Sequence, residues 1–268
     1  MCDQLRSAWC LCLFLLLPLS AWSDDDALAL ARLVAERPAN EGRTGIMHFH
    51  LESDGGRVRD RRARMIHSER EDVERIAIFF TAPAMIADTA FLSLDHDSRP
   101  DENWLYLPAT DRVRRLPVSE RGDAFMGTDL SYGDVKDNFK FPLEDWDFTR
   151  GPDAERDGRM LPVLRGTARS PEIAKETGYG AFEALVDPVS AFPVHIRYTD
   201  RDGDPLKEVE VEEIEVVGGA HTAMRFKARN LQTGHSTAIH FTEMRYVRTV
   251  PEEAFEPASL SYGVPELR

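Results

Sequence analysis

The chain has 268 residues, and its 47 Asp and Glu residues outnumber its 33 Lys and Arg residues, which gives a formal net charge of −14. This acidic surplus argues against nonspecific nucleic-acid binding, because that binding depends on Lys and Arg displacing counterions from phosphates. All three cysteines, Cys2, Cys10 and Cys12, lie in the first 23 residues. The other 245 residues therefore offer no disulfide, no Cys-ligated zinc and no cysteine nucleophile.

Residues 1–23 have the order of an export signal. Arg6 precedes an apolar run over residues 8–19, and Ala21 and Ser23 supply small side chains at the −3 and −1 positions of a signal peptidase site. The run is shorter than the ~20 residues that cross a bilayer. A lipoprotein signal is the alternative, but Cys10 stands before most of the apolar run instead of after it. We expect an exported protein that is cleaved after Ser23, with residues 24–268 as a single domain.

The rest of the chain predicts one helix followed by strands. Residues 24–36 have the apolar spacing of an amphipathic helix, which Arg37 and Pro38 end. Alternating apolar and polar residues then predict antiparallel strands. These are residues 47–51, 59–68, 76–80, 90–94, 103–107, 112–116, 146–150, 161–169, 179–186, 194–199, 206–217, 221–230 and 236–246. Between the sixth and seventh strands, residues 119–140 lack alternation and predict a loop with short helical turns. Long insertions of this kind are often functional.

Two predicted strands, 206–217 and 236–246, shift the phase of their alternation part-way, which is the pattern of a β-bulge. In the first, a loop at residues 218–220 gives a register that pairs Val211 with Phe226 beyond the bulge. Bulges bend their strands, so we predict a mainly β fold with a strongly curved antiparallel sheet. The apolar face of such a sheet must be covered by its own side chains or by a ligand.

The sequence offers little support for catalysis. His48 and His50 would share one strand face, a spacing that can ligate a metal. The spacing selects no third ligand, although His67 or His96 could be proposed, so we interpret the pair as a solvated face and expect no metal. Residues 95–102 are acidic, but a loop that starts at Asp95 lacks the glycine at the sixth position and the glutamate at the twelfth position of an EF-hand. No Gly-x-Ser-x-Gly elbow, phosphate loop or dinucleotide fingerprint is present, so we expect no catalytic residue and no cofactor.

Four arginines form a basic island in this acidic chain, at Arg112, Arg114, Arg115 and Arg121. They flank the insertion, and two interpretations stay open. They are either the solvated charges of a hairpin, or the contact for an anionic head group or an acidic partner at the mouth of an apolar groove.

Three segments carry a resemblance to a known family: Trp-Leu-Tyr-Leu-Pro at residues 104–108, Arg-Val-Arg-Arg-Leu at 112–116, and Phe-Met-Gly-Thr-Asp-Leu-Ser-Tyr-Gly-Asp-Val at 125–135. With them the chain resembles the LolA-like branch of the outer-membrane lipoprotein-sorting proteins, which are periplasmic carriers of Gram-negative bacteria. The resemblance covers essentially the whole chain after residue 23. Gly133 departs from the pattern, which has an acidic residue there. The resemblance implies an incomplete, strongly curved antiparallel β-barrel, with helices and loops as a lid over an apolar cavity.

The resemblance also implies a periplasmic carrier without catalysis. It would bind lipids or the acyl chains of lipoproteins and pass them from an inner-membrane transporter, of the RND or ABC type, toward an outer-membrane acceptor. We expect inward strand residues to line the cavity, residues of the insertion to act as its lid, and the four arginines to contact a head group or partner. The expected cavity residues are Phe49, Leu51, Ile78, Phe80, Leu92, Trp104 and Tyr106, and the expected lid residues are Phe125, Met126 and Tyr132.

Two alternatives to a carrier stay open. The first is an accessory subunit that regulates an RND-type exporter and carries nothing, which a core packed shut by its own side chains would favour. The second is a metal-dependent periplasmic enzyme that uses His48 and His50.

Overall fold

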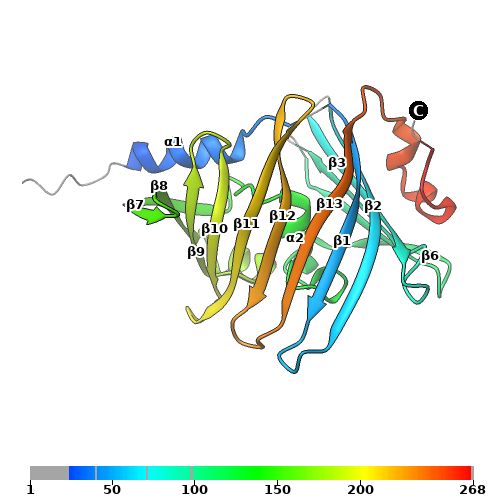
Figure 1. Ribbon diagram of the computed structural model, residues 1–268, viewed down its shortest axis with the longest axis horizontal. Coiled ribbons are helices and arrows are strands. Elements are labelled where there is room, and N and C mark those ends of the chain that lie inside the picture. Colours follow the sequence, from blue (N-terminus) through cyan, green and yellow to red (C-terminus); the bar gives the residue numbers. More distant parts are fainter. Residues whose placement is uncertain (1–23, 40, 71, 97–98, 267–268) are drawn as a thin grey trace, which may run out of the picture.

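The computed structural model describes residues 24–39, 41–70, 72–96 and 99–266 (Figure 1). The predicted export signal and its cleavage site after Ser23 lie outside the described residues. Within this part of the chain, no helix is both long enough and apolar enough to cross a lipid bilayer.

The described residues form one antiparallel sheet of thirteen strands, in the order β6-β5-β4-β3-β2-β1-β13-β12-β11-β10-β9-β8-β7. The sheet curves into a half-barrel whose edge strands, β6 and β7, are not paired with each other (Figure 1). The strands are β1 (Arg43–Glu52), β2 (Val58–Arg70), β3 (Val73–Ala82), β4 (Ala90–His96), β5 (Glu102–Leu107), β6 (Arg112–Leu116), β7 (Trp146–Arg156), β8 (Arg159–Ala168), β9 (Ala181–Asp187), β10 (Phe192–Thr199), β11 (Pro205–Val217), β12 (Ala220–Asn230) and β13 (Ser236–Tyr246). The predicted fold class, a mainly β protein with a curved antiparallel sheet, is confirmed.

Both predicted bulges are present. The register between β1 and β13 shifts near Glu243, which has a positive φ of 53°. The register between β11 and β12 shifts after Val211, and beyond the shift Val211 lies opposite Phe226 as predicted.

The predicted three-residue loop between β11 and β12 is wrong. Val217 pairs with Ala220, so the loop consists of Gly218 and Gly219 alone. Their φ angles are 55° and 89°. Positive φ at both positions is characteristic of a type I′ hairpin turn, whose twist matches that of the flanking strands. The pairing near the turn is therefore offset by one residue from the prediction.

The concave inner face carries the larger of two apolar clusters. The insertion between β6 and β7 covers it with η1 (Val118–Glu120), η2 (Phe125–Gly127) and α2 (Tyr132–Asp137), and Figure 1 shows α2 behind β12. The predicted N-terminal helix, α1 (Asp24–Ala35), adds Leu30 and Val34 to this cluster and contacts β7 and β8. A third helix, α3 (Pro171–Thr177), was not predicted, although Ser170 caps its start and Gly178 follows its end.

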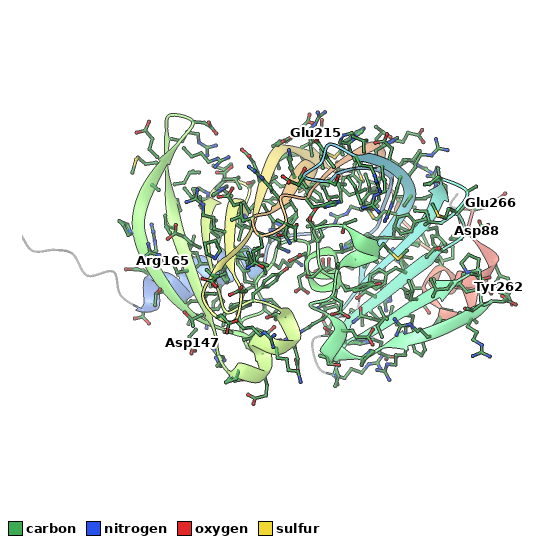
Figure 2. All side chains as sticks on the ribbon, turned by 90° about the horizontal axis from the view of Figure 1, so that it is seen from below. Asp88, Asp147, Arg165, Glu215, Tyr262 and Glu266 are labelled. Carbon is green, nitrogen blue, oxygen red and sulfur yellow. The ribbon has the colours of Figure 1, made fainter. Side chains whose placement is uncertain are left out.

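The convex outer face carries the second apolar cluster, over β2 to β5. The C-terminal segment covers it with η3 (Glu252–Phe255) and η4 (Pro257–Tyr262), which bury Phe255 and Leu260. Figure 2 shows this segment, with Tyr262 and Glu266 labelled, at the opposite end of the molecule from Arg165 of β8. Strands β2 to β5 are therefore buried on both faces, and the strands on the other side of the half-barrel are not.

Candidate functional site

Four of the seven predicted cavity residues lie on the inner face. Phe49 and Leu51 of β1 and Ile78 and Phe80 of β3 are each at most 1% exposed and belong to the inner cluster. Alternation along each strand turns these side chains to the same side of the sheet, toward the insertion.

The other three predicted cavity residues lie on the outer face, so their assignment was wrong. Leu92, Trp104 and Tyr106 belong to the cluster under the C-terminal segment. The inner positions of β4 and β5 are held instead by Phe91 and Leu105, which are paired with each other. The pattern misled because both faces of these strands are apolar, and alternation then no longer tells the inside from the outside.

The three predicted lid residues do lie over the inner face. Phe125 is fully buried, and its ring centroid lies 5.4 Å from that of Phe91, 6.0 Å from that of Phe80 and 5.4 Å from that of Tyr132. Met126 has a positive φ of 52° and packs against the same cluster. Phe125 and Tyr132 thus pack their rings against the concave face of the half-barrel, and we call these two residues the aromatic plug.

Asp129 attaches the insertion to β13 and to the turn before it. Its Oδ2 lies 2.6 Å from Nδ1 of His235 and accepts a hydrogen bond of 2.7 Å from the Thr237 hydroxyl. The backbone N–H of Asp129 donates to the same hydroxyl at 3.1 Å. We call this group the first pin.

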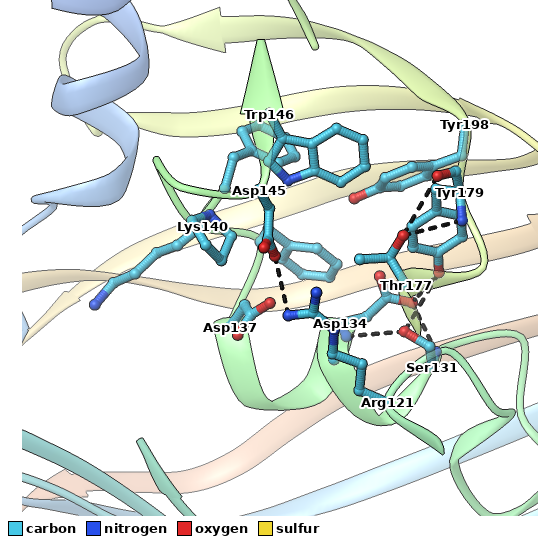
Figure 3. Close-up of a pocket in the computed structure, with 14 residues that line it drawn as sticks. Arg121, Ser131, Asp134, Asp137, Lys140, Asp145, Trp146, Thr177, Tyr179 and Tyr198 are labelled. Atoms are coloured by element: carbon cyan, nitrogen blue, oxygen red, sulfur yellow. Dashed lines mark hydrogen bonds and ion pairs between the residues drawn. The ribbon is translucent and has the colours of Figure 1, made fainter. Parts of the chain in front are cut away.

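A second pin, made by Asp134, Lys207 and Tyr179, attaches α2 to β11. Oδ2 of Asp134 accepts hydrogen bonds from the Lys207 ammonium, from the Tyr179 hydroxyl at 2.9 Å and from the Ser131 N–H at 2.6 Å. The Lys207 and Asp134 side chains are only 5% and 4% exposed. Burial raises the pKa of Tyr179 well above its ordinary value, so the hydroxyl keeps its proton. Figure 3 shows Ser131, Asp134 and Tyr179 converging beneath Thr177.

Directly after α2, the chain turns through two left-handed residues. Asn138 and Phe139 have φ angles of 47° and 60°. Asparagine tolerates this region, but phenylalanine is strained in it, and strain of this kind is often found at functional sites. Phe141 stacks on Phe182 with ring centroids 3.9 Å apart. We call Phe139 and Phe141 the turn phenylalanines.

Two small cavities lie under the insertion, one on each side of Asp134 and Phe139, which line both. The first has a volume of about 30 Å³, and its walls include Trp146, Tyr179 and Tyr198 (Figure 3). The second has a volume of about 50 Å³, and its walls include Met47, Met65 and Ile239. Each has room for a few water molecules at most, so the interior is closed by its own side chains.

A polar cleft of about 980 Å³ borders both cavities. It is lined by residues near the ends of β2 to β5 and by residues 136–144. It shares Lys140 and Phe141 with the first cavity, and Glu74 and Lys136 with the second.

The Lys136 side chain of α2 contacts acidic residues of the segment 95–102, whose sequence was compared above with an EF-hand. Its ammonium lies 2.8 Å from Asp95, 2.8 Å from Asp101 and 2.6 Å from Asp137. Burial opposes the charge of Lys136, but these three carboxylates raise its pKa well above the ordinary value. Burial also raises the pKa of Asp95 to about 7. Lys136 therefore offsets part of the negative charge here.

His67, Glu69 and Glu74 form the cluster of the described residues whose donor atoms are close enough for a metal, within 4.8 Å of one another. His67 Nε2 lies 2.8 Å from Glu74, which also accepts a hydrogen bond of 2.9 Å from Lys140. Burial and the nearby Arg43 lower the pKa of His67 to about 4. The positive charges of Arg43 and Lys140 would repel a metal ion, so we interpret the cluster as a buried ion-pair network.

The histidines of the alternative metal site do not share one face of the sheet. The side chains of His48 and His50 point to the outer face of β1, whereas that of His67 points to the inner face of β2. The ring of His48 stacks instead on His240, with centroids 4.5 Å apart.

The predicted arginine island is not one surface. Arg112 is exposed, Arg114 lies 3.3 Å from Glu120, and the alternation of β6 turns Arg115 to the other face of the sheet. Arg121 is mostly buried in ion pairs of 3.0 and 3.3 Å with two carboxylates. Of the four, Arg121 borders the first cavity and the cleft.

The sequence prediction missed the second pin and the turn phenylalanines. One signal was available for the pin, because Lys207 shares its strand phase with the inward-facing Val209 and Val211. A lysine in the buried phase of a strand requires a partner.

Comparisons with known proteins agree with this fold. A family described as "uncharacterized protein" matches residues 72–262. No curated protein matches the chain. An outer membrane lipoprotein-sorting protein domain from Vibrio parahaemolyticus is 24% identical with a TM-score of 0.80, and the match covers 89% of this chain and 100% of that one.

Two further solved structures are similar. A DUF1329 family protein from Desulfovibrio piger is 22% identical with a TM-score of 0.80, covering 88% of this chain and 98% of that one. A LolA superfamily protein from Nitrosomonas europaea is 18% identical with a TM-score of 0.65, covering 86% and 97%. No catalytic family is indicated by these likenesses. The chain therefore belongs to the family that matches residues 72–262, and it has the LolA-like fold that its sequence resemblance implied.

Proposed function

We propose that the protein is a carrier that binds the acyl chains of a lipid or lipoprotein between the inner face of the half-barrel and the insertion. One observation carries this proposal. The apolar inner face is covered mainly by the insertion between β6 and β7, which two polar pins hold in place and which turns through the strained Phe139 beside an open cleft.

The energetics of such a carrier are favourable. Each methylene group that a bound chain buries contributes about 0.8 kcal/mol. The cavities of about 30 and 50 Å³ are too small for a chain, so Phe139 and Phe141 have to move aside. A chain that takes their place restores the apolar contacts that they lose, and the movement is reversible at delivery.

The carrier would act in the periplasm after removal of residues 1–23. The order of the export signal supports this location, as does the fold shared with proteins described as lipoprotein-sorting. Cargo would pass from an inner-membrane transporter, of the RND or ABC type, toward an outer-membrane acceptor.

The test is lipid binding by the purified, delipidated protein. We expect saturable binding of a labelled phospholipid, together with a rise in unfolding temperature at saturating lipid. Phe125→Asp should weaken binding, whereas Glu210→Ala, an outward change on β11, should leave it unchanged. Absence of saturable binding to the wild-type protein would contradict the proposal, and equal effects of the two substitutions would contradict the role of the insertion.

The closed interior favours a second candidate, an accessory subunit that docks on an exporter and carries nothing. Its cavities would stay closed and no lipid would bind. The same binding experiment therefore separates the two functions.

A further inference from the structure

We infer that the cargo is an amphiphile with two apolar chains, which lie on opposite sides of α2 and share one head group in the polar cleft. This inference rests on the proposed carrier function. It starts from the division of the interior, since the two cavities are separated by Asp134 and Phe139 and have no other lining residue in common.

Of the two residues that separate the cavities, Asp134 is fixed more firmly than Phe139. Withdrawing α2 from the sheet would separate the buried Asp134 carboxylate from the Lys207 ammonium, and an unpaired buried charge is strongly unfavourable. Displacing the ring of Phe139, which borders both cavities, or the ring of Phe141, which borders the first, breaks apolar contacts alone, and an incoming chain replaces them. Each cavity can therefore widen toward its own side while α2 stays in place.

Both cavities meet the same cleft. The first cavity shares five lining residues with it, Arg121, Asp137, Lys140, Phe141 and Pro142, and the second shares Glu74 and Lys136. Two chains joined at one head group fit this arrangement, because the joint lies in the cleft and the chains pass on either side of α2. A single chain fills one side only.

The charge of the cleft bears on the head group. Among the described residues that line it, eight are Asp or Glu and five are Lys or Arg. Three of the carboxylates are already shared by Lys136. A surplus of carboxylates repels an anionic head group and favours one that carries an amine.

Native mass spectrometry of the full mature protein tests this with three probes: dioleoyl phosphatidylethanolamine, its single-chain lyso form, and dioleoyl phosphatidylglycerol. We expect the wild-type protein to bind one molecule of the two-chain phosphatidylethanolamine or two of the lyso form, and to bind phosphatidylglycerol more weakly. Stoichiometry on the wild-type protein needs no variant to fold.

Two substitutions fill one cavity each. Thr177→Leu narrows the first and Val135→Phe narrows the second, while Met160→Phe enlarges an exposed side chain of the β7–β8 hairpin as the control. Each filled variant should bind one lyso molecule. It should bind the two-chain lipid at least about tenfold more weakly, because lost burial of two methylene groups already weakens binding by about that factor.

The outcomes are distinct. One lyso molecule on the wild-type protein, or unchanged two-chain binding in both filled variants, would overturn the two-chain inference while leaving a carrier. Equal binding of phosphatidylglycerol would overturn the head-group argument. No binding of any probe would overturn the proposed function itself, and the inference with it.

Discussion

Replacing Lys207 with methionine should strongly destabilise the protein. The substitution keeps the length and apolar stem of the side chain but removes the ammonium that donates to Asp134 and Tyr179. Asp134, 4% exposed, then keeps a buried charge without its cation. Breaking a buried pair in this way costs about 3–5 kcal/mol. In a chain of this size each kcal/mol lowers the unfolding temperature by about 2–4 °C, so we expect a fall of roughly 6–20 °C.

Thermal unfolding followed by circular dichroism measures this effect, and Arg165→Met is the matched control. Arg165 pairs with Glu183 at 2.7 Å, but these side chains are 50% and 40% exposed, and such surface pairs contribute about 0–1 kcal/mol. The double variant Lys207→Met/Asp134→Leu should recover much of the loss, because apolar replacement of a whole buried pair is often neutral or stabilising.

Two results would refute the reasoning. If Lys207→Met lowers the unfolding temperature no more than Arg165→Met does, the second pin does not hold the insertion. If the double variant is as unstable as Lys207→Met alone, the loss does not come from an unpaired Asp134.

Three further predictions concern single positions. The free energy of unfolding should fall by up to about 3 kcal/mol as pH drops from about 6.5 to about 4, because burial and Arg43 lower the pKa of His67 to about 4 and the unfolded chain therefore takes up the proton first. Urea unfolding at several pH values should show that this free energy depends less on pH in His67→Gln, and an unchanged pH dependence would contradict the assignment. Gly166→Ala should lower the free energy of unfolding by about 1–3 kcal/mol, since a Cβ there would lie 2.2 Å from the Phe182 ring. Adding Phe182→Leu to this variant should relieve the clash, and wild-type stability of Gly166→Ala would exclude it. Asn138→Ala should cost about 1–2 kcal/mol because its φ is 47°, while Asn138→Gly stays near neutral, so equal unfolding temperatures of the two variants would exclude backbone strain.

The sequence predicted the strands well because each one alternates or is bounded by turn residues. It predicted the faces less well. Ile78 and Phe80 were assigned inward correctly, but Leu92 and Trp104 were not. The apolar outer face of these strands is covered by residues 250–262, a long-range contact that no local pattern contains.

The candidate site was predicted only in its local part. The motif around Phe125 marked the plug, since consecutive residues carry it. The partners of the two pins come from β11, from β13 and from the turn before it, and the sheet order that brings Lys207 and His235 to the insertion depends on the pairing of distant strands. Sequence reasoning without that order could identify an unusual inward lysine, but not its carboxylate.

The pins and the apolar residues of the insertion do different work. Apolar contact is non-directional, so rings such as Phe139 and Phe141 could cover the inner face in several positions at similar free energy. The hydrogen bonds of Asp129 and Asp134 exist in one position only, and a buried charge without its partner excludes the alternatives. Burial therefore supplies most of the stabilisation, while the pins fix where the cover lies. In the proposed carrier, a chain that enters beside α2 would replace apolar contacts and leave the pins intact, so the cover would yield to cargo without losing its place on the sheet.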